Sequence, residues 1–439
     1  MRIAMIGTGY VGLVSGACFA DLGHDVICID NDQNKLDLLE QGKIPIYEPG
    51  LDELVSKNVQ AGRLKFAAWA AGDIQNQDAI FIAVGTPPNE LDGNADLSAV
   101  YAVAAELAPK LSGYTVVINK STVPVGTGDE VEEIIRTANP NANFDVASNP
   151  EFLREGSAID DFMKPDRVVV GTDAERASDV MRSIYRPLIL NETPVIITGR
   201  TTSELIKYAN NAFLATKVTF INEIADICEA TGANVQDVSK GIGLDTRIGH
   251  KFLQAGAGFG GSCFPKDSLA LTDTARKIGR PTQIVEAVIS ANRERKRRMA
   301  EKIIAACGGD VNGKTLAILG VTFKPNTDDM RDAPSLDIVP LLQAAGAKIR
   351  AYDPEGMQHA RTMLSDVEWG EDSYSIMKDA SALLILTEWN AFRMLDMAQV
   401  KSLLTEPLII DLRNIYTLEE MSQVGVTYHS VGRPIVKPA

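Results

Sequence analysis

Short apolar runs alternate with stretches of helical periodicity at both ends of this chain, and this alternation limits the possible folds more than any other feature. Near the N-terminus the apolar runs are RIAMIG, DVICID, AIFIAVG and TVVINKST. After Gly313 the alternation returns with KTLAILGVTF, AKIRAYD, ASALLILT and PLIIDL, and a helix is predicted near 335–345. Because strands that alternate with helices form parallel sheets covered on both faces, we expect two doubly wound α/β domains.

The middle of the chain has a different pattern. From Thr201 to Ala230 there is no Pro or Gly, and apolar residues recur at helical spacing, which predicts one long helix. A second helical stretch is predicted over 282–306. A chain of 439 residues is long enough for two or three domains. We therefore expect domains at 1–200, 201–300 and 301–439, the middle one helical.

The charge and the cysteines exclude several classes of function. A net charge of -15 argues against nucleic acid or a membrane surface as partner, and the basic run 293–298 is expected to be a solvated helix face. Five widely spaced cysteines without a CxxC pair predict neither a disulfide framework nor a zinc site, and they suit a reducing cytoplasm. The histidines are not spaced as metal-binding pairs either, so no metal is expected. They are His24, His250, His359 and His429.

A dinucleotide-binding fingerprint follows the first predicted strand. Gly7, Gly9 and Gly12 form a GxGxxG turn that opens a helix, where backbone amides can approach a pyrophosphate. Asp30 ends the second strand, eighteen residues after Gly12, where a carboxylate can bind a ribose 2'-hydroxyl. Asp30 would repel a 2'-phosphate, and the next residues offer Lys35 but no Arg. The pattern therefore predicts a Rossmann-like domain that binds NAD.

Cys263 lies in the segment GFGGSCFPKD, directly before a helix that we expect to begin at Pro265. A helix N-terminus and the neighbouring Lys266 favour a thiolate, and the glycines leave room for a substrate. These features suit a nucleophile as well as an inert core thiol. The other four cysteines lie in apolar runs, so we expect them to be packing residues.

Six segments together resemble one known family across nearly the whole chain. They are GTGYVG, KSTVPVGT, NPEFLREGSAI, ELIKYANNAFLATK, GFGGSCFPKD and GVTFKPNTDDMRDAPS. In order and spacing the chain resembles the UDP-glucose/GDP-mannose dehydrogenase family, and its UDP-glucose branch in particular. The resemblance implies an N-terminal NAD domain, a central helix used in homodimerisation and a C-terminal domain that holds the nucleotide sugar. It also implies oxidation of UDP-glucose to UDP-glucuronate, with two hydrides passed to NAD and the cysteine as covalent nucleophile.

The resemblance implies roles for six catalytic residues. Cys263 is the nucleophile, and Lys207 and Asn211, four apart on one helix face, stabilise an oxyanion at C6. Asp267 orients water or transfers a proton beside Lys207. Thr122 helps to hold the catalytic water, and Glu151 assists thioester hydrolysis.

The resemblance also implies two sets of binding residues. The NAD contacts are Gly7, Gly9, Tyr10, Val11, Gly12, Asp30, Lys35, Thr86, Thr122, Glu155, Lys266 and Arg331. The nucleotide-sugar contacts are Glu151, Phe152, Leu153, Arg154, Glu155, Lys207, Asn211, Arg247, Phe252, Leu253, Gln254, Ala255, Gly256, Gly260 and Lys324. Arg247 resembles an arginine that is donated across the dimer. Ala255 stands where many bacterial relatives carry proline.

Two alternatives remain beside UDP-glucose oxidation. GDP-mannose and UDP-N-acetylhexosamine dehydrogenases share the fold and the thiol chemistry, so the fold does not choose the sugar. The acetylhexosamine branch typically has His before the cysteine and the mannose branch Leu after it, whereas this chain reads GGSCFPKD. A non-catalytic sensor of nucleotide sugars is the other alternative, although a binding protein has no need of a thiol or a hydrolytic water.

Overall fold

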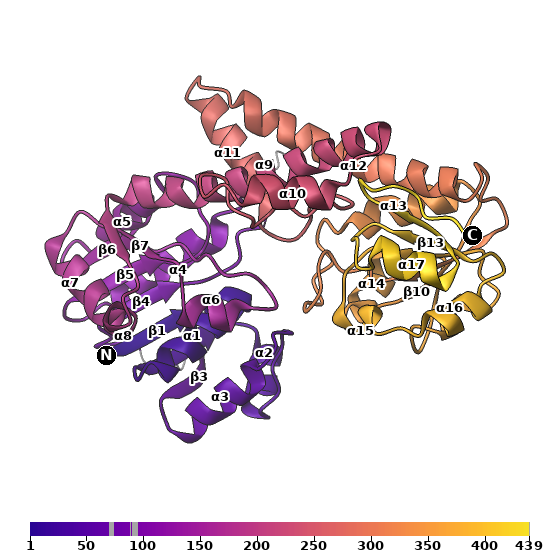
Figure 1. Ribbon diagram of the computed structural model, residues 1–439. Coiled ribbons are helices and arrows are strands. Elements are labelled where there is room, and N and C mark those ends of the chain that lie inside the picture. The colour runs from indigo at the N-terminus through magenta and orange to yellow at the C-terminus, as the bar shows by residue number, and fades with distance from the viewer. Residues whose placement is uncertain (70–73, 88, 90–94, 439) are drawn as a thin grey trace. The chain divides into compact units, whose positions relative to one another are not determined.

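The computed structural model describes residues 1–69, 74–87, 89 and 95–438. The chain divides into two compact units, and each is described by itself (Figure 1). The first unit comprises Met1–Asn210 with Asp273–Ile278, and the second comprises Asn211–Thr272 with Gly279–Ala439. The expected division into three domains at 200 and 300 stays a prediction.

The first unit is built on an eight-stranded sheet with the order β3-β2-β1-β4-β5-β6-β7-β8. Neighbouring strands are parallel, except that β6 and β7 meet antiparallel at Ser148 and Gly171. The chain order reverses between β1 and β4, where the carboxyl ends of parallel strands form a crevice for ligands. The strands are β1 (Arg2–Ile6), β2 (Asp25–Asp30), β3 (Leu64–Ala68), β4 (Ala79–Ile82), β5 (Thr115–Asn119), β6 (Phe144–Ser148), β7 (Val168–Gly171) and β8 (Val195–Thr198).

Helices cover both faces of this sheet. Ile3 and Met5 of β1 belong to one apolar cluster, and Ala4 and Ile6 belong to another, because successive side chains of a strand point to opposite faces. Both faces are therefore buried, as a doubly wound fold requires. The helices are α1 (Tyr10–Asp21), α2 (Gln33–Glu40), α3 (Leu51–Gln60), α4 (Ser98–Leu107), η1 (Ala108–Lys110), α5 (Thr127–Ala138), α6 (Ala158–Met163), α7 (Glu175–Ile184) and α8 (Arg186–Leu190).

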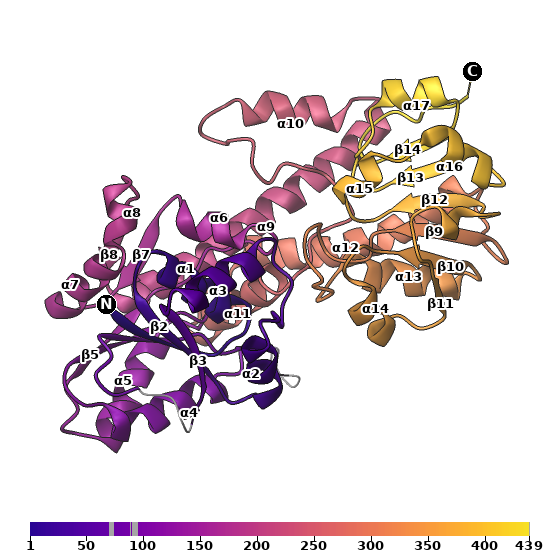
Figure 2. The ribbon, with the colours of Figure 1, turned by 90° about the horizontal axis from the view of Figure 1, so that it is seen from below.

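The second unit contains a six-stranded parallel sheet with the order β11-β10-β9-β12-β13-β14 (Figure 2). Leu316 and Ile318 of β9 pack in one apolar cluster and Ala317 and Leu319 in another, so this sheet too is buried on both faces. The expected pair of doubly wound α/β sheets is confirmed. The strands are β9 (Thr315–Leu319), β10 (Lys348–Tyr352), β11 (Val367–Trp369), β12 (Ala382–Ile385), β13 (Leu408–Asp411) and β14 (Thr427–Ser430).

A helical region separates the two sheets along the chain. Its longest helix, α9 (Arg200–Thr231), has 32 residues and extends the predicted helix by one residue at each end. The predicted helix at 282–306 is α12 (Gln283–Ala306). The other helices after α9 are α10 (Val235–Gly243), α11 (Phe264–Lys277), α13 (Pro334–Ala344), α14 (Met357–Met363), η2 (Ser375–Met377), α15 (Asn390–Arg393), α16 (Met397–Leu403) and α17 (Leu418–Val424).

The basic run 293–298 lies on α12 as expected, but the prediction that it is a solvated face was wrong in part. Arg295 and Lys296 are buried. Arg295 donates to the carbonyl of Gly256 and pairs with Asp226, and Lys296 donates to the carbonyl of Asp332. Two of these charges therefore hold backbone carbonyls inside the second unit. Such bonds are not visible as a sequence pattern, because their partners are distant along the chain.

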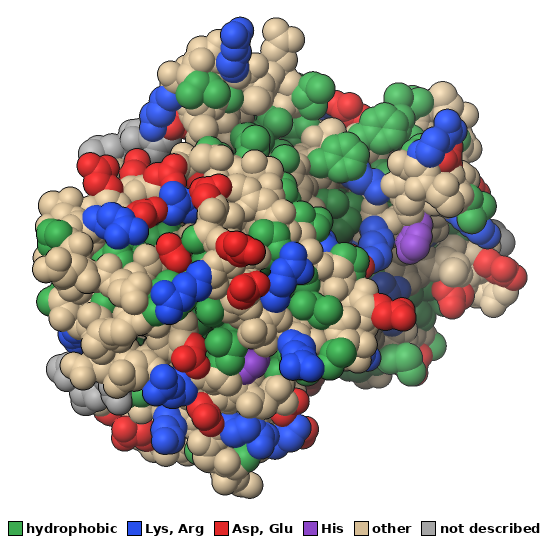
Figure 3. All heavy atoms as spheres, turned by 90° about the vertical axis from the view of Figure 1, so that its left-hand side faces the viewer, with side chains coloured by type: hydrophobic (Ala, Val, Ile, Leu, Met, Phe, Trp, Pro, Cys, Tyr) green, Lys and Arg blue, Asp and Glu red, His purple; other side chains and the backbone are tan. Residues whose placement is uncertain are grey.

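The surface and the helices bear on possible partners. On the face that Figure 3 shows, Lys and Arg side chains are interspersed with Asp and Glu. Among the residues that the structure describes, no helix combines the length and the apolar character needed to cross a bilayer. In the same part of the chain, no three His, Cys, Asp or Glu side chains are grouped as a metal site.

Candidate active site

The fingerprint turn lies between β1 and α1 in the first unit. Gly7 has φ of +99°, and a Cβ atom there would lie 2.6 Å from the carbonyl oxygen of Ala83. A Cβ at Gly12 would lie 1.9 Å from the carbonyl oxygen of Gly7. At Gly9 the described residues leave the space around such an atom open, and Gly9 precedes the first residue of α1. The turn thus needs glycine for its own packing and presents a helix N-terminus, which fits a dinucleotide pyrophosphate.

Asp30 lies at the carboxyl end of β2, next to this turn. One of its oxygens accepts hydrogen bonds from the backbone and side chain of Thr8, both at 2.7 Å, and the other accepts from the backbone of Asp32 at 2.9 Å. Burial alone would raise the pKa of Asp30, but these bonds and the charge of Lys35 hold it below its usual value. Asp30 is therefore a carboxylate fixed by the turn, with the positive charge of Lys35 nearby, and its contact to a ribose stays a prediction. Thr86, buried after β4, donates to the carbonyl of Thr122 at 3.0 Å.

A second network joins the fingerprint to the segment after β6. The carboxylate of Glu48 accepts from the hydroxyl of Tyr10, from the backbone of Gly156 at 2.6 Å and from that of Ala158 at 2.7 Å. Burial, followed by the bond to Glu48, raises the pKa of Tyr10, and Glu155 contributes in the same direction. Tyr10 and Glu155, both expected to bind cofactor, therefore lie in one neighbourhood.

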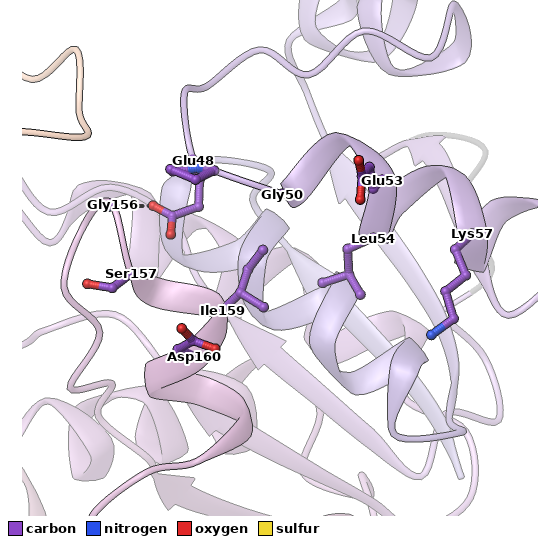
Figure 4. Close-up of a pocket in the computed structure, with 10 residues that line it drawn as sticks. Glu48, Gly50, Glu53, Leu54, Lys57, Gly156, Ser157, Ile159 and Asp160 are labelled. Carbon is purple, nitrogen blue, oxygen red and sulfur yellow. Dashed lines mark hydrogen bonds between the residues drawn. The ribbon is translucent and has the colours of Figure 1, made fainter. Parts of the chain in front are cut away.

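Beside Glu48, a pocket of about 370 Å³ opens between α3 and the start of α6 (Figure 4). Figure 4 shows Glu48 directed toward Gly156, with Glu53, Leu54 and Lys57 contributed by α3. Sequence reasoning assigned no function to this pocket or to Glu48. No sequence motif marks Glu48, and only the folded structure shows that it lies beside Gly156.

Glu151 and Lys207 form a buried ion pair in the first unit. The ammonium of Lys207 lies 2.9 Å from Oε1 of Glu151 and donates to its carbonyl at 2.8 Å. Burial would raise the pKa of Glu151, but Lys207, the backbone of Leu153 and the charge of Lys120 hold it below its usual value. Glu151 is thus an ionised carboxylate, able to accept a proton or to order a water molecule.

Lys120 is a further buried ammonium close to this pair, and sequence reasoning missed it. It donates to Asn149 at 3.1 Å and to the hydroxyl of Tyr185 at 3.4 Å. Burial lowers the pKa of Lys120 to about 8, although Glu151 acts in the opposite direction. Lys120 stands in the segment KSTVPVGT, but the sequence alone does not show that its ammonium is close enough to interact with the charge of Glu151.

Thr122 and Lys207 line a small cavity in the first unit. Its volume is about 10 Å³, which is close to the space that one water molecule occupies. The lining residues are Asn119, Ser121, Thr122, Val123, Ser148, Pro150, Glu204 and Lys207. Six of these eight residues carry polar side chains, so the cavity suits a single ordered water beside the two predicted catalytic residues.

Cys263 lies in the second unit, one residue before α11, which begins at Phe264 rather than at the expected Pro265. The glycines that lead to it are tightly packed. A Cβ at Gly260 would lie 2.2 Å from the carbonyl oxygen of Asp332, and one at Gly261, with φ of +84°, would lie 2.7 Å from the Phe323 ring. The loop is thus fixed against its own unit, and the thiol is held partly exposed at a helix N-terminus, a position that favours thiolate.

Asp267 is fully buried one turn into α11 and connects the predicted catalytic residues of this unit. Its backbone donates to the carbonyl of Cys263 at 2.8 Å, and its Oδ2 accepts from the amide of Asn211 at 2.7 Å. Its Oδ1 lies 2.9 Å from the ammonium of Lys266. The structure therefore brings Cys263, Asn211, Asp267 and Lys266 together.

The predicted nucleotide-sugar contacts have varied surroundings. In the loop before Cys263, Leu253 and Ala255 pack into the apolar core of the second unit. Phe252 has φ of +65°, and its ring lies 5.9 Å from that of Phe264. The backbone of Gly256 donates to Asn222 at 2.8 Å. The carbonyls of Leu253 and Gly256 accept from Ser239 and Arg295, so this loop is fixed to its own unit through side chains and backbone alike.

The remaining predicted contacts are basic or flank Glu151. Arg247 is exposed and pairs with Asp245, and Arg331 is exposed and pairs with Asp329. Lys324 lies over the ring of Phe323 at 5.3 Å. Arg154 pairs with Asp161. Val11 is the second residue of α1, Phe152 and Leu153 follow β6 directly after Glu151, and Gln254 is an exposed residue of the loop before Cys263.

Comparisons with known proteins cover the whole chain. Models of the UDP-glucose/GDP-mannose dehydrogenase family match residues 1–189 as its NAD binding domain, 201–294 as its central domain and 317–418 as its UDP binding domain. A UDP-glucose 6-dehydrogenase of Rhizobium meliloti is 58% identical over 99% of this chain and 100% of its own length. The UDP-glucose 6-dehydrogenase TuaD of Bacillus subtilis is 50% identical over 99% and 94%. The structure of a UDP-glucose dehydrogenase from Pyrobaculum islandicum is 37% identical, covers 99% of this chain and 98% of its own, and superposes with a TM-score of 0.90.

Proposed function

Since the chain belongs to the UDP-glucose/GDP-mannose dehydrogenase family, we propose that it is an NAD-dependent UDP-glucose 6-dehydrogenase. It oxidises the C6 alcohol of UDP-glucose to the carboxylate of UDP-glucuronate. The observation that carries this proposal is the 58% identity, over nearly the whole of both chains, to a UDP-glucose 6-dehydrogenase. The placement of Cys263 before α11 supports it. Oxidation of an alcohol to a carboxylate, unlike oxidation to an aldehyde alone, needs a thiol that binds the aldehyde covalently.

The proposed reaction proceeds through bonds to Cys263. NAD bound at the fingerprint turn would accept one hydride in each of the two oxidations. The C6 alcohol first loses a hydride and a proton to give an aldehyde. The Cys263 thiolate adds to this carbon, and the former carbonyl oxygen takes up a proton to give a thiohemiacetal. The thiohemiacetal then loses a second hydride and that proton to become a thioester. Water then breaks the C–S bond, releases the carboxylic acid and returns the thiol.

Lys207 and Asn211 stabilise the oxygen at C6 in these steps. They are four residues apart on α9, and both are buried, so a charge that develops on this oxygen would meet an ammonium and an amide away from bulk water. The bond from Asn211 to Asp267 fixes the orientation of the amide. We assign proton transfer to Asp267, whose carboxylate is held between Asn211 and Lys266.

Hydrolysis of the thioester uses Thr122 and Glu151. Thr122 lines the one-water cavity with Lys207, and Glu151 is an ionised carboxylate paired with the same lysine. A carboxylate with a lowered pKa accepts a proton from water less readily by itself, so we assign it the orientation of water and the stabilisation of Lys207 as a cation.

The binding roles predicted from the sequence complete the proposal. Asp30 and the fingerprint select NAD, with Lys35, Thr86, Glu155, Lys266 and Arg331 as further contacts. The loop 252–256, Gly260 and Lys324 hold the nucleotide sugar with the segment 151–155. We propose domain boundaries at 200 and 300 that separate the NAD-binding, central and sugar-binding parts of the chain.

The buried thiols Cys18, Cys28, Cys228 and Cys307 suit a reducing compartment, and we place the protein in the cytoplasm.

We also propose a homodimer formed through α9. Phe213, Phe220 and Ile227 recur every seven residues on this helix, and each is about half exposed or more. A repeat of seven keeps side chains on one face of a helix, so they form an apolar stripe that a second copy of the chain would cover. Arg247, exposed and on the loop after α10, is the arginine that we expect to be donated to the partner's site.

A panel of nucleotide sugars tests the function. UDP-glucose should be oxidised with kcat/KM at least about tenfold above GDP-mannose and UDP-N-acetylglucosamine, a difference of about 1.4 kcal/mol in transition-state binding. Preference for one of the other two sugars would reassign the substrate within the family. Absence of NADH formation with all three, in protein shown to bind NAD, would favour a non-catalytic sensor.

A further inference from the structure

Glu204 is a buried carboxylate on α9 that the proposed chemistry does not use. Only 3% of the residue is exposed. Its Oε2 accepts from the backbone of Gly126 at 2.7 Å, and its Oε1 accepts from the backbone of Gly128 at 2.9 Å and from the hydroxyl of Ser148 at 2.8 Å. Both carboxylate oxygens are thus fixed by protein donors.

The two amides belong to the start of α5. Gly126 is the residue before this helix, has φ of +100° and carries no side chain that could cap it. A helix N-terminus has backbone N–H groups that its own turns leave unpaired, and a carboxylate is the favoured partner for them. Glu204 supplies this carboxylate from a different element, so it fastens the first turn of α5 to α9.

The turn that Glu204 fastens carries Thr122. The segment from Thr122 to Gly126 spans five residues between β5 and α5, and Thr127 closes it by donating to the carbonyl of Pro124 at 2.7 Å. Glu204, Thr122 and Lys207 line the same cavity of about 10 Å³. Glu204 also precedes Lys207 by three residues on α9, so it lies on the same side of that helix. One carboxylate therefore links the two groups beside the one-water cavity.

We propose that Glu204 is a positioning residue for hydrolysis of the thioester, an inference that rests on the proposed function. By holding the start of α5 against α9, it keeps Thr122 and Lys207 at the separation that admits one water. Because its hydrogen bonds go to the start of α5 and to Ser148, we give it no part in the hydride transfers. Its loss should slow the hydrolytic step selectively, because a displacement of about 1 Å can cost about 100-fold in rate.

The test compares Glu204→Gln with Glu133→Gln by rapid mixing with UDP-glucose and NAD. Glu133 is exposed on α5, so its variant makes the same charge change on the helix that Glu204 fastens. The amide nitrogen of Gln cannot accept from an N–H group, so one contact to the turn is lost.

In Glu204→Gln we expect a burst of two NADH per site at nearly the wild-type rate, followed by turnover slowed about 10- to 100-fold. The acyl-enzyme should accumulate in intact-mass spectra, with KM for UDP-glucose changed less than about threefold. Glu133→Gln should behave as the wild type.

Other outcomes would overturn the inference. Normal turnover of Glu204→Gln without acyl-enzyme would show that the clamp does not matter for hydrolysis. An equal loss in the burst and in later turnover, with a lower Tm, would show a structural role only. If Glu204→Gln does not fold, Ser148→Ala removes one bond to Glu204 and should give the same pattern with a smaller effect, about three- to tenfold. A wild type that releases only one NADH per UDP-glucose would instead refute the proposed function, and this inference with it.

Discussion

The buried pair of Glu151 and Lys207 makes stability as well as activity depend on one contact. Their side chains are 5% and 4% exposed, and the ammonium lies 2.9 Å from the carboxylate. In Lys207→Ala the carboxylate of Glu151 would stay buried. It would keep the backbone of Leu153 as a donor at 2.5 Å, and the charge of Lys120 nearby. The remaining partners offset the loss only in part.

The magnitude follows from these contacts. Removing one partner of a buried ion pair costs about 3–5 kcal/mol, and we take the lower end because Leu153 and Lys120 remain. For a unit of this size, 1 kcal/mol corresponds to about 2–4 °C in Tm, so Lys207→Ala should lower the Tm of the first unit by about 6–12 °C at pH 7. Overall turnover should fall by several orders of magnitude as well.

The pH dependence has a definite sign. The pKa of Glu151 is lowered in the folded protein, so the stability that the pair contributes is present above the usual carboxyl pKa, about 4.3, and is lost as the pH falls through the lower folded value. The difference in Tm between wild type and Lys207→Ala should therefore narrow in acid.

Differential scanning calorimetry measures this difference, with Lys43→Ala as the matched control because Lys43 is exposed. The control should stay within about 0.5 kcal/mol of the wild type. Replacement of both partners, as Lys207→Met with Glu151→Leu, should recover much of the lost stability, since a buried pair and an apolar pair of similar volume are often nearly equivalent. A Tm for Lys207→Ala within about 2 °C of the wild type would refute the reasoning.

Three further predictions concern the cofactor, the dimer and the thiols. Asp30→Ala should narrow the preference for NAD over NADP in kcat/KM, and equal use of both by the wild type would contradict the role of Asp30. Phe220→Glu should shift the protein toward monomer in analytical ultracentrifugation, whereas an unchanged dimer would place the interface elsewhere. Iodoacetamide at pH 8 should alkylate Cys263 first, because burial raises the pKa of Cys28 to about 12 and that of Cys307 to about 11. Equal labelling of all three would argue against an activated thiol.

The sheets could be predicted from the sequence because their strands are buried on both faces. Such strands are continuous apolar runs, and AIFI and ALLI fall within predicted runs as β4 and β12. The sequence reading did not identify β3, β6, β7, β8, β11 or β14. Some of these are partly exposed or polar, as TYHS in β14, so their apolar pattern is weak.

The site was predicted only where a local motif carries it. Gly7 and Cys263 stand in motifs with a local physical reason, a tight turn and a helix start. Glu48 and Glu204 escaped prediction because they act on amides that are 108 and 76–78 residues away. Arg295 was misjudged for the same reason, since its carbonyl partner lies 39 residues away. From sequence alone, a charged residue is predicted to be exposed, because the distant partner that would stabilise it in the interior cannot be identified.

Covalent catalysis by Cys263 is the central claim, and Cys263→Ser tests it most directly. The wild type should yield two NADH per UDP-glucose without free aldehyde. The serine variant should fold and bind UDP-glucose, but its turnover should fall by several orders of magnitude because a hydroxyl is a far poorer nucleophile at neutral pH. The measurement is NADH per UDP-glucose consumed, with intact-mass spectrometry to detect an ester adduct that hydrolyses more slowly than the thioester. If Cys263→Ser still produces two NADH per UDP-glucose at a near-normal rate, the covalent mechanism is wrong.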